Sequence, residues 1–249
     1  MTDMNAKSGS VVHAHPFLRR LTGAGTLSEK DITLLMDAQR NRIKVGAGRD
    51  LVRAGQPATS TYVVQSGWFI LHCLFNDGRR QIYALALPGD VIGEFAPYRA
   101  ETTYNVTALT SGEVAALNPA AFLGLKDNSL AIAHALGTNS ARDTSILGDQ
   151  IIRLGRLSAY ERHCHLMLEI WHRCHEIGEV QDGWIDWPLK QVDMADILGL
   201  SLVHVNRTVM QLKRDGLITL EKRRLRLNDP EKMAELSGFE AAKVSLKAA

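Results

Sequence analysis

The sequence predicts an α+β protein in which a β-rich N-terminal domain, one long helix and a mainly helical C-terminal domain follow one another. Its 249 residues are enough for two modest domains, each with a core of its own. Between Ile43 and Leu117, glycines separate short runs of β-forming residues, which is typical of a small antiparallel roll. Residues 130–154 lack proline and carry an apolar face, and residues 186–220 combine helical periodicity with a tight turn.

The N-terminal domain is expected over residues 17–125, after a small, polar tail of residues 1–16 that we expect to be disordered. Residues 17–39 have the pattern of amphipathic helix. The clearest strands are residues 61–65, 68–75, 80–87 and 112–117. The sequence Asn76-Asp77-Gly78 is a strong hairpin signal, so we expect neighbouring strands to pair as an antiparallel β-roll.

Residues 126–155 are predicted to form a long dimerisation helix. Leu147, Ile151 and Leu154 follow the 4–3 spacing of a helix seam, and Leu136 belongs to the same predicted seam. Such a stripe favours contact between two copies of the helix. Burial of the stripe against the roll of its own chain is the alternative.

The hinge between the domains is predicted at residues 154–158. Gly155 is expected to break the long helix, and Ser158 with Glu161 forms a capping box for the next helix. The C-terminal domain then covers residues 156–229, and residues 230–249 are expected to form a final helix or tail.

Residues 191–198 have the pattern of a short amphipathic helix that ends at a turn. Gly199 permits a left-handed turn, Leu200 fills the angle, and Ser201 is a good N-cap for a second helix. The residues expected to face inward from this second helix are Val205, Val209 and Leu212. Two helices joined in this way form a helix-turn-helix, whose second helix presents its N-terminal residues to the DNA major groove.

Residues 217–227 read as a β-hairpin with a basic tip, which would be the wing of a winged helix-turn-helix. Residues 207–226 contain seven Lys or Arg and two acidic residues, a local balance of +5 in a chain whose net charge is only +2. Cations beside a recognition helix favour contact with DNA phosphates. The predicted DNA-binding residues are Lys190, Val192, Ser201, Val203, His204, Asn206, Arg207, Lys213, Lys222, Arg223 and Arg224.

This arrangement of domains resembles the CRP/FNR family of bacterial transcription regulators, with a roll like a cyclic-nucleotide-binding domain. The resemblance rests on Gly55 with residues 62–67, and on residues 88–94, 161–162 and 200–218, and it covers about residues 17–228. It implies a homodimer that binds an operator of double-stranded DNA. It also implies a response to an effector held in the roll, and it leaves contact with RNA polymerase open.

The resemblance places an effector pocket at Gly93, Glu94, Thr102, Thr103, Leu147 and Gly148. In the cyclic-AMP branch an Arg-Ser pair meets the cyclic phosphate, and the corresponding positions here hold Thr102 and Thr103. A threonine hydroxyl carries no charge, so the charged contact is lost. We therefore expect no cyclic nucleotide.

Neither haem nor an iron–sulfur cluster is expected as a cofactor. No cysteine precedes Cys73, whereas the iron–sulfur branch of the family needs an N-terminal cysteine cluster. The carbon-monoxide branch uses Cys and His where this chain has Gly93 and Phe95.

One helical face carries His165, Glu169, His172 and Glu176, which could hold a divalent metal. Solvated His–Glu pairs explain this spacing more simply, so no metal site is predicted. The chain has neither an apolar stretch of about 20 residues nor a signal peptide, and its three cysteines form no CxxC pair. These features favour a cytoplasmic protein with no membrane contact.

The sequence therefore predicts a sequence-specific transcription regulator that binds a pseudo-palindromic operator as a homodimer. A second hypothesis is an effector-binding or protein-interaction module that does not bind DNA. The basic tip at residues 222–224 favours the regulator, because an interaction module has no need of cations there. A metal-dependent enzyme is the third hypothesis, and no nucleophile–base pair or phosphate loop supports it.

Overall fold

A computed structural model describes residues 15–22 and 26–241 of the chain. Residues 1–14, most of the predicted tail, and residues 242–249 of the predicted C-terminal segment lie outside the described residues. By its internal contacts the chain divides into two compact units. Of the described residues, the first unit contains 15–71 and 85–141, without 23–25, and the second contains 72–84 and 142–241.

Antiparallel strands build the first unit and include every strand predicted for the roll. They are Arg42–Val45 (β1), Asp50–Val52 (β2), Thr61–Ser66 (β3), Phe69–Leu74 (β4), Arg80–Ala86 (β5), Val91–Ile92 (β6), Asn105–Ala108 (β7) and Gly112–Leu117 (β8). One four-stranded sheet has the order β1-β8-β3-β6, and another has the order β2-β7-β4-β5. The parts of β4 and β5 nearest their connecting turn, residues 72–84, belong to the second unit.

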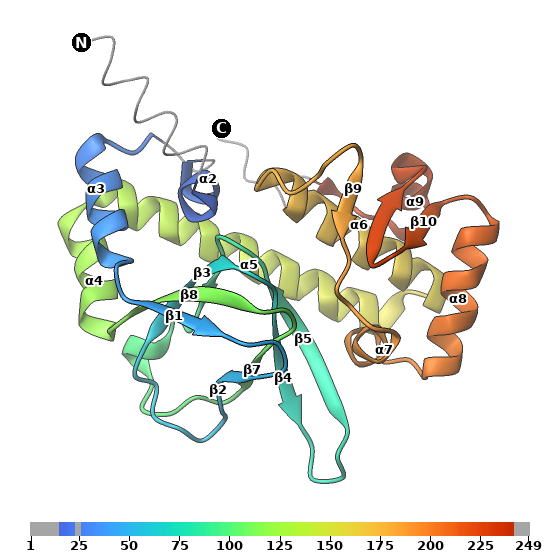
Figure 1. The fold of residues 1–249 in the computed structure, drawn as a ribbon, viewed down its shortest axis with the longest axis horizontal. Coiled ribbons are helices and arrows are strands. Elements are labelled where there is room, and N and C mark those ends of the chain that lie inside the picture. The colour runs from blue at the N-terminus through green and yellow to red at the C-terminus, as the bar shows by residue number, and fades with distance from the viewer. Residues whose placement is uncertain (1–14, 23–25, 242–249) are drawn as a thin grey trace. The chain divides into compact units, whose positions relative to one another are not determined.

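Two apolar clusters form the core of this unit. Val64, Phe69 and Val114 belong to one cluster, which is contributed by strands of both sheets. The other joins β3 and β8 to helices, with Leu18 and Phe122 among its members. These helices are Pro16–Thr22 (α2), Glu29–Ala38 (α3), Pro119–Asn128 (α4) and the start of Leu130–Arg156 (α5), and the short turn Ala96–Tyr98 (η1) contacts α4 (Figure 1).

The second unit is mainly helical and continues from α5. Its elements are Ala159–Glu176 (α6), Trp184–Asp186 (β9), Gln191–Leu198 (α7), Leu202–Arg214 (α8), Ile218–Glu221 (β10), Arg224–Leu227 (β11) and Pro230–Ser237 (α9). The three strands form one sheet in the order β10-β11-β9, and α9 packs on α6. This is the predicted winged helix-turn-helix, with β9 as a third strand that the sequence did not reveal.

The prediction that Gly155 ends the long helix is wrong. α5 continues through it to Arg156, and the interruption follows at residues 157–158. The capping box predicted for the next helix is present, because the Ser158 hydroxyl accepts a hydrogen bond from the Glu161 amide and the Glu161 carboxylate accepts one from the Ser158 amide. By internal contacts the two units divide within α5, after Ala141. The hinge predicted at residues 154–158 includes the interruption between α5 and α6 and stays a prediction.

Candidate nucleic-acid interface

The turn between α7 and α8 has the geometry that the sequence predicts. Gly199 is left-handed, with a φ of 62°. Ser201 then caps α8, and its hydroxyl accepts a hydrogen bond from the His204 amide at 3.3 Å. Val205 and Leu212 are buried on the inner side of α8. This packing fixes which side of α8 stays open to solvent.

The open side of α8 carries the residues predicted to contact DNA bases. Val203 is 71% exposed, a large value for an apolar side chain. His204, Asn206 and Arg207 are also exposed, as is the capping residue Ser201. An apolar side chain is therefore available at the start of α8 for contact with a partner.

In α7 two neighbouring positions depart from the usual burial of apolar and acidic side chains. Val192 is exposed, as its assignment to the DNA-binding residues requires, whereas the acidic Asp193 is only 5% exposed. Asp193 accepts hydrogen bonds from the Lys190 amide and from Arg80, which explains why an acidic side chain is buried there. Val192 stays on the candidate interface, as does the exposed Lys190.

Gln191 is a candidate interface residue that the sequence reasoning missed. Its side-chain oxygen accepts a hydrogen bond from Asn206 Nδ2 at 3.3 Å, and both residues are exposed. This contact joins the first turn of α7 to the open side of α8. Asn and Gln amides can pair with adenine, so this is a suitable group for the interface.

The wing turns between β10 and β11 at two residues, Lys222 and Arg223. Both have left-handed backbones, with φ values of 48° and 60°. The hairpin is closed by the pair Glu221 and Arg224, so the turn has the positive φ values of type I′. This turn favours Asn and Gly, yet two cations occupy it. The next basic residue, Arg224, lies over the Trp184 ring with its Cζ atom 5.4 Å from the ring centroid.

Lys213 has a structural contact in addition to its charge. Its Nζ atom donates a hydrogen bond to the Leu220 carbonyl at 2.6 Å. The contact ties the last turn of α8 to β10, so the wing is braced against the predicted recognition helix. Lys213 therefore holds the wing, and its ammonium group is less available to a phosphate than the sequence suggested.

The predicted dimer seam is exposed at two of its four residues. Leu147 and Ile151 on α5 are 44% and 67% exposed. Leu136, in contrast, is 2% exposed and belongs to the core of the first unit, so its assignment to the seam is wrong. Leu154 is half-buried, and its Cδ2 atom is 3.3 Å from the place where a Cβ at Gly199 would lie. The exposed part of the stripe is therefore shorter than predicted.

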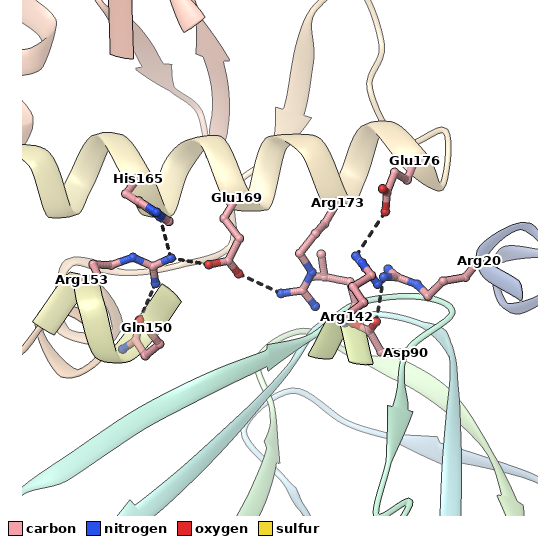
Figure 2. Close-up of polar contacts among 10 residues, drawn as sticks. Arg20, Asp90, Arg142, Gln150, Arg153, His165, Glu169, Arg173 and Glu176 are labelled. Atoms are coloured by element: carbon pink, nitrogen blue, oxygen red, sulfur yellow. Dashed lines mark hydrogen bonds and ion pairs between the residues drawn. The ribbon is translucent and has the colours of Figure 1, made fainter. Parts of the chain in front are cut away.

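The expected solvated His–Glu face on α6 is instead buried at His165 and Glu169 and half-buried at His172 and Glu176. Glu169 forms ion pairs with Arg153 of α5 and Arg173 of α6, and Arg153 also contacts the Nδ1 atom of His165 and the side-chain oxygen of Gln150 (Figure 2). Burial alone would raise the pKa of Glu169, but the two guanidinium groups outweigh it and hold the pKa below its usual value. The carboxylate is thus a partner of arginines, which explains its burial.

The described residues contain no group of three or more His, Cys, Asp or Glu side chains arranged to hold a metal ion. Cys164 and Cys174 are buried on α6. Burial raises the pKa of the Cys164 thiol to about 12, so it stays protonated and unreactive at neutral pH. In the part of the chain that is described, no helix combines the length and apolar character needed to cross a membrane.

The predicted effector pocket is only partly brought together. A cavity of about 130 Å³ in the first unit is lined by Gly93, Thr102 and Thr103, together with Arg99, a cation that the sequence reasoning did not place there. The Thr102 hydroxyl donates to the Arg53 carbonyl at 2.6 Å, so it is already engaged.

The other predicted pocket residues do not line this cavity. Glu94 accepts hydrogen bonds from the Ser140 hydroxyl at 2.6 and 2.7 Å and forms an ion pair with Lys126 at 3.3 Å. The Glu94 carboxylate is therefore bound by Ser140 and Lys126 and does not line the cavity. Leu147 and Gly148 on α5 are not lining residues either.

Comparison with known proteins agrees with both units. Residues 42–129 match the cyclic nucleotide-binding domain family, and residues 161–236 match the Crp-like helix-turn-helix domain family. The transcriptional activatory protein AadR of Rhodopseudomonas palustris is 30% identical over 197 residues, which cover 78% of this chain and 80% of that protein. The transcriptional activator protein FnrL of Cereibacter sphaeroides is 30% identical over 196 residues, covering 77% and 78% of the two chains. The structure of FixK2 from Bradyrhizobium japonicum aligns with a TM-score of 0.72 at 25% identity, covering 80% of this chain and 98% of that one.

Proposed function

This chain belongs to the CRP/FNR family of bacterial transcription regulators, and we propose that its homodimer binds a pseudo-palindromic operator with α8 as the recognition helix. Its named relatives are transcriptional activators, and its own residues 161–236 match the Crp-like helix-turn-helix domain family, which supports a sequence-specific DNA-binding regulator. The observation that carries the proposal is the open side of α8 beside a cationic wing tip. Such a role needs no catalytic chemistry, and we expect the protein to act where bacterial DNA lies, in the cytoplasm.

We propose that the residues of this interface divide the work of recognition. Arg207 can donate two hydrogen bonds to O6 and N7 of guanine, so one G·C pair should be required in each half-site. Val203 offers an apolar surface suited to a thymine methyl group, and Gln191 with Asn206 provides an amide group for a neighbouring base. Lys222, Arg223 and Arg224 at the wing supply affinity for phosphates that does not depend on sequence.

Selection from random double-stranded DNA with the full chain tests the proposed function. We expect two inverted half-sites whose centres lie about one helical turn, roughly 34 Å, apart. Arg207→Ala should cost about 1–3 kcal/mol of binding free energy and relax base choice at one position of each half-site. Arg40→Ala removes the same charge from the segment just after α3 and serves as the control.

The selection also separates the alternatives. Failure of the wild-type chain to enrich any motif would favour an interaction module that does not bind DNA. An unchanged motif with Arg207→Ala, together with a changed motif for a wing variant, would show that α8 is not the recognition helix.

The effector of the first unit is a separate part of the proposal. We propose that this unit does not take a cyclic nucleotide, because the cavity of about 130 Å³ is smaller than the roughly 300–1,000 Å³ of ordinary ligand pockets. We likewise propose that the regulator works without haem or an iron–sulfur cluster. Contact with RNA polymerase at the operator completes the proposed role.

A further inference from the structure

The first helix of the helix-turn-helix, α7, is held at its C-terminal end by side chains from three other elements. The last carbonyl groups of a helix have no partner within it and must find one elsewhere. Gln81 of β5 donates to the Asp196 carbonyl at 2.7 Å, and Gln150 of α5 donates to the Ile197 carbonyl at 2.7 Å. Arg162 of α6 donates to the Leu198 carbonyl at 2.8 Å.

Arg80, beside Gln81 at the start of β5, contacts two carboxylates of α7 at once. Its Nε atom donates to Asp196 at 2.7 Å and its Nη2 atom donates to Asp193 at 2.8 Å. Asp193 is buried, and Arg80 and Asp196 are half-buried. Because the planar Arg80 guanidinium bonds two carboxylates at once, it fixes the orientation of α7 as well as its distance from β5. A single flexible charge, such as a lysine ammonium, would not fix the orientation.

These contacts leave the candidate interface open. Lys190, Gln191 and Val192 at the start of α7 remain exposed, and so does the open side of α8. Residues 72–84 belong to the same compact unit as α7. The hairpin β4–β5 therefore binds α7 through Arg80 and Gln81 and covers none of the residues predicted to contact DNA.

We propose that Arg80 and Gln81 are positioning residues. By holding α7 they fix the direction in which each copy of the chain presents α8 to DNA, so that the two copies of the dimer fit operators with one particular spacing between half-sites. The inference rests on the proposed function, since it concerns the same operator. Its physical basis is that a dimer gains affinity from its second half-site only if geometry allows both copies to bind together. Loosening α7 should reduce that gain and leave the contacts of each half-site intact.

The test uses the full chain and three kinds of DNA duplex derived from the motif that the wild-type protein selects. One duplex has both half-sites, one has a single half-site beside scrambled sequence, and a set has the half-sites moved apart by one or two base pairs. The variants are Arg80→Ala and Gln81→Leu, and the latter removes the donors without changing the net charge. Arg79→Ala is the matched control, because Arg79 lies next in sequence and pairs with Asp77 in the exposed turn.

Arg80→Ala and Gln81→Leu should each lower affinity for the two-site duplex by about tenfold or more. Affinity for the single half-site should stay within about twofold of the Arg79→Ala value for Arg80→Ala, which corrects for the lost charge, and within about twofold of the wild-type value for Gln81→Leu. Both variants should also accept altered spacings that the wild type rejects. Arg80→Lys keeps the charge without the fork, and it should lie between the wild type and Arg80→Ala.

Equal losses on the one-site and two-site duplexes would overturn the proposal, because they indicate damage to the binding surface itself. Unchanged two-site affinity and unchanged spacing preference in both variants would overturn it as well. A failure of the proposed function looks different, since the wild-type chain would then select no two-site motif. Should Arg80→Ala fail to fold, Gln81→Leu and Arg80→Lys give the same comparison.

Discussion

Replacing Lys222 and Arg223 by Asn and Gly should stabilise the protein while it weakens DNA binding. A left-handed backbone costs roughly 1–2 kcal/mol for an ordinary residue, and both residues of this turn have it. Asn-Gly suits a type I′ turn, so relief at two positions is worth about 2–4 kcal/mol. The glycine gives back about 1 kcal/mol through the freedom of the unfolded chain.

The net gain should therefore be about 1–3 kcal/mol of unfolding free energy, which corresponds to several degrees in Tm for a chain of this size. One contact is lost, because the Arg223 guanidinium donates to the Pro188 carbonyl at 3.4 Å, a long and weak hydrogen bond. The Arg223 carbonyl, which accepts from the Trp187 amide at 2.7 Å, remains in the variant. Urea denaturation of both proteins measures the difference.

The effect on DNA follows from the number of cations removed, which is four in a dimer. If each meets one phosphate, the slope of log affinity against log salt should become shallower by up to about 3.6. The loss should be the same for operator and unrelated DNA. The double variant Lys222→Gln with Arg223→Gln removes the same charges but keeps the strained backbone, so it should lose affinity equally and gain no stability.

Either of two results would refute this reasoning. A less stable Asn-Gly variant would mean that the turn is not strained. An unchanged salt slope in both variants would mean that the wing tip does not meet phosphates, and the two cations would then have no explanation in the proposed function.

Three further predictions follow from other parts of the chain. Leu147→Asp should convert the dimer to monomers and abolish tight operator binding, and an unchanged dimer in sedimentation would place the seam elsewhere. Cyclic AMP and cyclic GMP should bind weakly or not at all in calorimetry, and a low-micromolar dissociation constant would show that Arg99 supplies the charge that Thr102 and Thr103 lack. Burial lowers the pKa of His163 from 6.5 to about 4. Between pH 6.5 and pH 4 the unfolded chain therefore binds more protons at this residue than the folded chain does. The contribution of His163 to the free energy of unfolding should be complete above pH 6.5 and fall by about 3 kcal/mol towards pH 4. His163→Gln should flatten that dependence in urea denaturation, and an equally steep loss would assign it to other groups.

The helix-turn-helix could be predicted in detail because its signals are local. The Ser201 cap and the left-handed Gly199 lie within a few residues of the helices they define, and the inward positions of α8 follow its periodicity. The strands β3, β4, β5 and β8 were predicted for the same reason, since their patterns and turns are adjacent in sequence. β9, at three residues, is too short to show a period.

What could not be predicted depends on partners far away in sequence. Asp193 is buried because Arg80 reaches it from 113 residues away, which no helical pattern can reveal. Glu94 was assigned to the pocket from its position in a motif, but Ser140 draws its carboxylate elsewhere. Arg99 was not predicted to line the cavity, because the pocket positions were assigned by their spacing along the sequence. Such spacing does not show which residues of a loop turn towards a cavity.

The pairing of Glu169 with Arg153 and Arg173 restricts how these positions can change during evolution. Removing one partner of a buried ion pair strands the others and costs about 3–5 kcal/mol, whereas exchanging the whole group for apolar residues is often neutral. A single substitution would therefore remove a large part of the stability of a protein whose free energy of unfolding is about 5–15 kcal/mol in total. Among related sequences, the three positions should therefore change together or stay constant together.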